Sequence, residues 1–125
     1  MKHNVALTVS SLLSLLFMTF HMTHDVILQA EGAVSYPIPV FVFALWLYGT
    51  VALAGRAWGY VIMLVGGLFA VGMIVIHAHG IVVSKSGGFF FVWTLFALST
   101  TGWVTMILSA RGLLTTIRSR RAASP

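Results

Sequence analysis

The sequence contains no cysteine and only two acidic residues among its 125 residues. Without cysteine, the protein can form neither disulfide bonds nor thiolate ligands, so any bound metal must be held by imidazole, carboxylate or thioether groups. Charged side chains make up only 7% of the chain, whereas 59% of its residues are hydrophobic. This balance leaves too little polar surface to cover a water-soluble globule, and it indicates an integral membrane protein.

Four long apolar runs account for most of the chain. We expect helices at about 5–28, 38–54, 60–83 and 89–108, because each run approaches the roughly 20 residues with which an α-helix crosses a bilayer. A transmembrane β-barrel would require apolar and polar residues in alternation, which these runs lack. The sequence therefore predicts one all-α membrane domain, an antiparallel bundle of four transmembrane helices joined by very short loops. A basic tail follows at 111–125.

The basic residues predict the orientation of this bundle. Lys2, Arg56 and the arginines of the tail fall on one side of the expected membrane, whereas Lys85 falls on the other. Because cytoplasmic segments are enriched in lysine and arginine, both termini are predicted to be cytoplasmic (N-in and C-in), as in a bacterial inner (plasma) membrane. The net charge of +5 then reflects topology and contact with anionic lipid headgroups, and we expect no nucleic-acid partner.

Four of the five histidines are predicted to lie at one level near the extracytoplasmic side. His21 and His24 come close to the outer end of the first helix, together with Asp25, and His77 and His79 come close to the outer end of the third. Ionisable side chains are costly inside a bilayer, so they tend to be retained where they line a site or a pathway. The sequence therefore predicts a functional cluster. The alternative is that these side chains only pack between helices and near headgroups.

Helical spacing predicts which members of this cluster meet. On the first helix, one narrow stripe carries His21, Asp25 and two serines. On the third helix, His77 shares a face with Met73 and several small residues, which allow a neighbouring helix to approach closely. His79 lies two positions after His77 and points nearly the opposite way, unless the helix breaks just beyond it. We therefore expect His77 to face His21.

The residue types of the cluster are typical ligands of transition metals. Neutral imidazole binds copper, zinc, iron and nickel, and a neighbouring carboxylate either binds the ion or orients an imidazole ring. His21, His24, Asp25, His77 and His79 therefore predict a metal site, with copper or zinc preferred to iron. Haem b is the alternative cofactor, because one histidine from each of two helices can bind the haem iron axially.

The predicted function is transition-metal binding by a small membrane protein that serves as a redox or accessory subunit of a larger membrane complex. At 13.6 kDa, the chain has little room for a substrate pocket of its own, which favours assembly with other membrane subunits or with further copies of itself. The same histidines also fit a protein that conducts protons or metal ions, in which serine and threonine hydroxyls would extend the path. No catalytic residue is identified from the sequence.

Overall fold

The computed structural model describes residues 2–28, 37–77 and 88–123, with side chains described for residues 4–24, 37–77 and 88–123. This part of the chain forms four helices: α1 (Lys2–Leu28), α2 (Pro37–Val51), α3 (Ala57–Ile76) and α5 (Gly88–Ala122). Three of them, α1, α3 and α5, contain segments that are long and apolar enough to cross a membrane, and α2 is a shorter apolar helix. The predicted all-helical architecture with helices of membrane-spanning length is confirmed.

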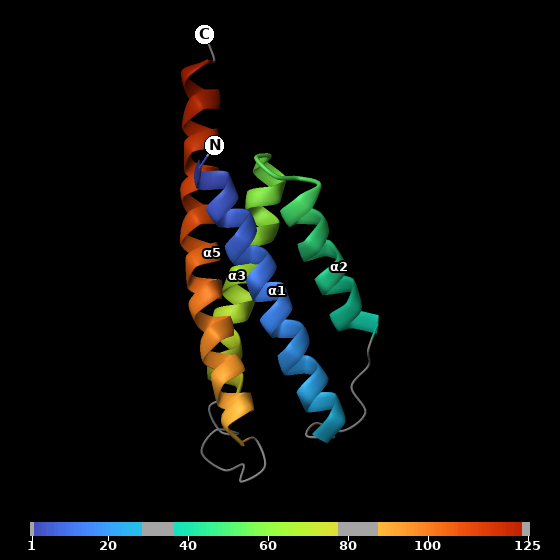
Figure 1. Cartoon of the computed structure of the whole chain (residues 1–125). Coiled ribbons are helices and arrows are strands. Elements are labelled where there is room, and N and C mark those ends of the chain that lie inside the picture. Colours follow the sequence, from blue (N-terminus) through green and yellow to red (C-terminus); the bar gives the residue numbers. More distant parts are fainter. Residues whose placement is uncertain (1, 29–36, 78–87, 124–125) are drawn as a thin grey trace.

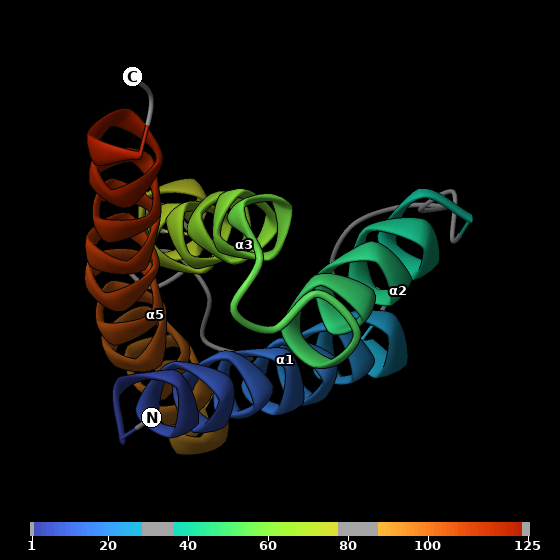
Figure 2. The same ribbon diagram turned by 90° about the horizontal axis from the view of Figure 1, so that it is seen from above.

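The helices α1 and α3 assemble on α5. It packs most extensively against α3 and next against α1, while α2 packs against α3 and α1. Viewed end-on, the helices surround a common centre and α2 lies farthest from α5 (Figure 2). The N-terminus, the turn between α2 and α3, and the C-terminal end of α5 lie at the same end of the bundle (Figure 1). The opposite end therefore collects the end of α1, the end of α3 and the start of α5.

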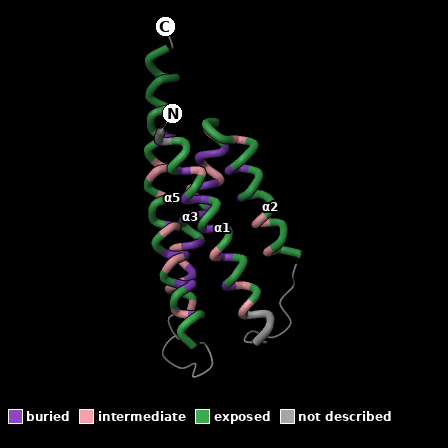
Figure 3. The backbone as a smooth tube through the Cα atoms, in the orientation of Figure 1, coloured by how far each residue is buried: buried purple, intermediate pink, exposed green. Residues whose placement is uncertain are grey.

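Each long helix buries one stripe of residues and exposes the remainder (Figure 3). The exposed remainder includes large apolar side chains such as Val65, which is 60% exposed, and Phe96, which is 58% exposed. Water would disfavour such a surface, whereas lipid tails are as apolar as these side chains. The outer surface of the bundle is therefore suited to a lipid environment.

The backbones of α3 and α5 touch where two glycines face each other. A Cβ atom added to Gly67 would lie 2.9 Å from the carbonyl oxygen of Gly102, and one added to Gly102 would lie 2.7 Å from the Cβ of Ala70. Small residues permit such close approach of helices in membranes, where packing replaces the hydrophobic effect as the main source of association. This crossing holds α3, and with it His77, in a fixed position against α5.

Buried hydroxyl groups join α1 to α2. The indole Nε1 of Trp46 donates to Ser11 Oγ at 2.9 Å, Ser11 Oγ lies 2.8 Å from Thr50 Oγ1, and Thr50 Oγ1 donates to the carbonyl oxygen of Trp46 at 2.8 Å. Because the single hydroxyl proton of Thr50 is directed to that carbonyl, Ser11 donates to Thr50. The three residues thus form a closed ring of hydrogen bonds, which offsets the cost of burying these polar groups.

Two helix ends differ from the predicted ones by more than three residues. The third helix ends at Ile76, before the predicted limit at residue 83, and residues 78–83 lie outside the described part. The last helix continues past residue 108 to Ala122, so the basic segment prolongs α5. With 35 residues, α5 is about 52 Å long, whereas the hydrocarbon core of a bilayer is about 30 Å thick. Its arginine-rich turns therefore extend beyond the other helices (Figure 1).

Candidate functional site

His21 of α1 and His77 at the end of α3 meet at the end of the bundle opposite the chain termini. Their ring centroids lie 4.8 Å apart, and the ring planes are nearly perpendicular, at 86°. His21 is fully buried, with 0% of its surface exposed. The structure therefore brings together the two histidines that helical spacing predicts to face each other, and the metal itself remains a prediction.

Phe91, in the first turn of α5, forms a common wall for three histidines. Its ring centroid lies 4.8 Å from that of His21, 5.7 Å from that of His24 and 5.8 Å from that of His77. Phe91 is itself buried, with 7% of its surface exposed. The sequence analysis did not identify this residue, although the run Phe89–Phe91 opens the last helix at the level predicted for the histidines.

The imidazole of His77 is oriented by the last turn of α3. Its Nδ1 lies 3.0 Å from the carbonyl oxygen of Met73, which also accepts the backbone N–H of His77 at 3.0 Å. Since a carbonyl oxygen can only accept, Nδ1 must carry the proton of the neutral ring, and Nε2 must carry the lone pair. Metal-binding histidines are commonly held in this way, by a hydrogen bond from the nitrogen that does not bind the metal.

The remaining predicted site residues are only partly described. His24 packs against Phe90 and Phe91, and its Nδ1 is buried without a hydrogen-bond partner among the described residues. His79 and the side chain of Asp25 lie outside the described part. Within the described part, no three histidine, aspartate or glutamate side chains lie close enough together to hold a metal ion. The described geometry thus supplies a pair of histidines with a third nearby, and not the predicted set of five.

Two methionines lie in the layer next to this histidine pair, toward the middle of the bundle. Met18 precedes His21 by one turn of α1, and Met73 precedes His77 by one turn of α3. Both methionines are buried, at 0% and 5% exposed, and they belong to the same packed cluster as Phe91. Met73 shares the predicted face of His77, and thioether is one of the ligand types that remain to a chain without cysteine.

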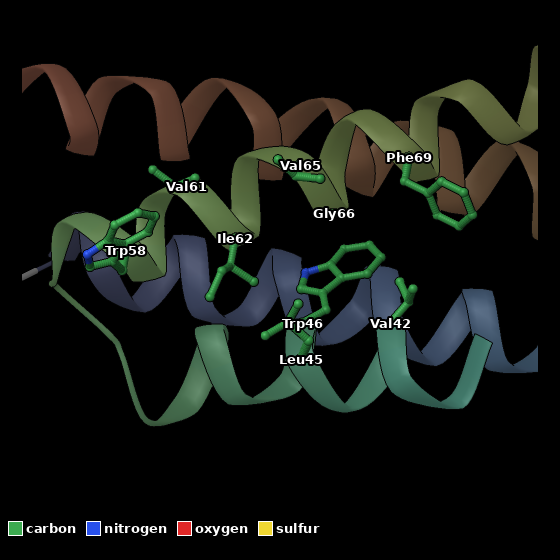
Figure 4. Close-up of a pocket in the computed structure, with 9 residues that line it drawn as sticks. All are labelled: Val42, Leu45, Trp46, Trp58, Val61, Ile62, Val65, Gly66 and Phe69. Carbon is green, nitrogen blue, oxygen red and sulfur yellow. The ribbon is translucent and has the colours of Figure 1, made fainter. Parts of the chain in front are cut away.

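A separate groove of about 350 Å³ lies between α2 and α3. Figure 4 shows the indole of Trp46 crossing this groove toward Gly66, with Trp58 at one end and Phe69 at the other. Its described lining residues are all apolar or aromatic: Val42, Leu45, Trp46, Trp58, Val61, Ile62, Val65, Gly66 and Phe69. None of them is titratable, so the groove is an apolar surface distinct from the histidine site.

Comparisons with known proteins leave this chain without a relative from which a function could be transferred. No protein-family model matches it. No curated protein and no solved structure matches it either. Its function must therefore be inferred from the chemistry of its own residues.

Proposed function

We propose that the protein is a small membrane protein that binds a transition-metal ion through His21 and His77, with His24 nearby. The observation that carries this proposal is the contact between a fully buried histidine and a second histidine from another helix. Each imidazole nitrogen lies about 2 Å from a metal ion that it binds, so one ion requires the two rings to be close neighbours. Asp25 and His79 complete the proposed ligand set, as the sequence predicts.

The contact between the rings favours a bare ion over haem b. A haem bound axially by His21 and His77 would place the plane of the porphyrin between the two imidazoles. The rings instead touch edge to face, with Phe91 alongside both. An ion fits between two such nitrogens after small ring rotations, whereas a porphyrin requires the helices to separate.

A proton conductor is less well supported, because the buried side chains between the histidines and the hydrogen-bonded hydroxyls of α1 and α5 are mostly apolar. Thr105 Oγ1 lies 3.1 Å from Ser10 Oγ and 3.5 Å from Ser14 Oγ, in a polar group nearer the chain termini. Between that group and the histidines lie four buried apolar side chains: Leu15, Met18, Leu95 and Leu98. The described hydroxyls buried in this span are those of Thr94 and Ser99 on α5, and Thr94 donates to carbonyl oxygens of its own helix.

The proposal includes the finer architecture that the sequence predicts: an antiparallel bundle with both termini in the cytoplasm. It is supported by the location of the turn between α2 and α3, which contains Arg56, and of the arginine-rich end of α5, at the end of the bundle that also carries the N-terminus (Figure 1). The metal would then lie at the extracytoplasmic level. We further propose that the protein acts as a redox or accessory subunit, because a chain of 13.6 kDa has little room for a substrate pocket of its own.

We expect the purified protein to contain a near-stoichiometric transition metal and to lack a Soret absorption band. His77→Ala should lower the affinity for that metal roughly 100-fold or more, because it removes an imidazole ligand, whereas loss of a group that only orients a ligand costs about 10–100-fold. Elemental analysis together with an optical spectrum measures both expectations. A Soret band that disappears in His77→Ala would instead establish the haem alternative.

His3→Ala is the matched control for this experiment, since His3 lies at the opposite end of α1 from His21. It should retain the metal content of the wild type. Reconstituted vesicles that conduct protons through the wild type, with no metal bound, would favour the conductor. Metal-free protein without any proton flux would contradict both proposals.

The absence of native cysteine allows a direct test of the proposed orientation. A single cysteine in place of Ser119, which is exposed on the extension of α5, should resist an impermeant thiol reagent added to intact cells and react after lysis. A cysteine in place of Glu31 should react in intact cells, because the predicted topology puts that position outside. The opposite labelling pattern would reverse the orientation and place the histidines on the cytoplasmic side.

A further inference from the structure

The layer beside the histidine pair contains thioether sulfur, and this bears on which metal the proposed site selects. Met18 is one turn from His21, and Met73 is one turn from His77. Met18 and Met73 pack in one buried cluster with Phe91, the residue that contacts both imidazoles. Two soft sulfur atoms thus accompany two imidazoles from the same two helices.

The choice of metal also depends on the oxidation states that are available. Zinc has only the dication available, whereas copper also exists as Cu(I).

We infer that the site binds Cu(I), with the thioether of Met73 or of Met18 as a ligand beside the imidazoles of His21 and His77. This inference rests on the proposed metal-binding function and narrows it from copper or zinc to monovalent copper. Thioether sulfur selects Cu(I) among the metals that imidazole also binds. Because Nδ1 of His77 is directed to the carbonyl oxygen of Met73, Nε2 is the nitrogen that would bind the metal.

The test compares conservative replacements in the two packed clusters of the core. Met18→Leu and Met73→Leu remove sulfur from the cluster beside the histidines at nearly unchanged volume. Met63→Leu makes the same change at a residue that is 1% exposed and belongs to the other cluster, with Leu7 and Tyr60. The full chain is purified in detergent without oxygen, and Cu(I) is titrated against a chromophoric chelator that competes for it.

We expect at least one of Met18→Leu and Met73→Leu to weaken Cu(I) binding roughly tenfold or more, a loss typical of a missing partner at a metal site. Met63→Leu should bind Cu(I) like the wild type, and X-ray absorption of the bound copper should detect sulfur scatterers. Binding of Zn(II) should be unaffected by any of the three replacements.

The possible failures are distinguishable. Bound copper with nitrogen and oxygen scatterers alone, and unchanged affinity in Met18→Leu and Met73→Leu, would overturn the thioether ligand while the proposed function stands. Tighter binding of Zn(II) than of Cu(I) in the wild type would overturn the choice of metal in the same way. A wild type that binds neither ion would contradict the proposed function, and the inference with it.

Discussion

Replacing Gly102 with valine should cause a large loss of stability, because it forces α3 and α5 apart at their close crossing. A Cβ at this position would lie 2.7 Å from the Cβ of Ala70 and 3.0 Å from the carbonyl oxygen of Gly67. Neither atom belongs to a flexible side-chain end, so α3 and α5 must move apart to admit the new methyl groups. Overpacking typically costs about 1–3 kcal/mol, and we expect about 3 kcal/mol here because the backbone itself is displaced.

Gly72→Val is the matched control, because it makes the same change within α3 at a position where an added Cβ meets no atom within 4 Å. Its thermal unfolding midpoint in detergent should stay close to that of the wild type, whereas that of Gly102→Val should fall by many degrees. The separation of α3 from α5 should also displace His77 from Phe91, so Gly102→Val is expected to lose metal as it loses stability. Equal destabilisation by the two variants would mean that helix propensity, and not the close crossing, determines the effect.

Hydropathy allowed the membrane-length helices to be predicted. It did not predict the C-terminal end of α5, because this helix continues after its apolar run has ended. The predicted fourth helix stops at residue 108, where the hydrophobic run ends, but α5 continues to Ala122. Arginine, leucine and alanine, which have high helix propensity, make up about half of the added segment, beside serine, threonine and glycine, which have lower propensity. Hydropathy thus indicates where a chain leaves the bilayer, and intrinsic propensity determines where its helix ends.

The end of α3 shows the opposite error. Three consecutive β-branched residues, Ile74, Val75 and Ile76, continue the apolar run and suggest a longer helix, yet they have lower helix propensity than leucine or alanine. At His77 the backbone leaves helical geometry, with φ −93° and ψ 3°. Helical rotation therefore does not predict the direction of side chains after His77. His79 lies outside the described part.

The meeting of His21 and His77 could be predicted because His21 lies on a regular helix and His77 directly follows one, and spacing along a helix determines direction. The stripe of α1 that carries His21 is buried as expected, and so is the face of α3 that carries Met73. Phe91 could not be identified in this way, since its contacts with the histidines depend on how α5 is placed against two other helices. The periodicity of the sequence predicts which residues share the buried face of each helix. The full set of residues at the site depends in addition on how α1, α3 and α5 pack together.

Replacing His21 with phenylalanine should abolish metal binding while leaving the fold largely intact. The imidazole contacts Phe91 and His77 at centroid distances of 4.8 Å, and a phenyl ring can keep both aromatic contacts. Volume-conserving changes usually cost less than about 1.5 kcal/mol, and the replacement also removes a buried polar ring from the core. We therefore expect an unfolding midpoint within a few degrees of the wild type, which thermal unfolding in detergent would measure.

The affinity of His21→Phe for the metal should fall roughly 100-fold or more, beyond the range typical of groups that merely orient a ligand, because a phenyl ring cannot bind a metal ion. His21→Leu provides a smaller apolar replacement in case the phenyl ring is too large for the site.

His3→Phe is the control for position, because it makes the same substitution about 27 Å away along α1 at a rise of 1.5 Å per residue. His3→Phe should change neither metal content nor stability. If both His21 variants unfold, this histidine serves packing; if either folds and retains the metal, the ligands lie elsewhere. A stable, metal-free His21 variant would show instead that the buried imidazole is kept for binding at no gain to the fold.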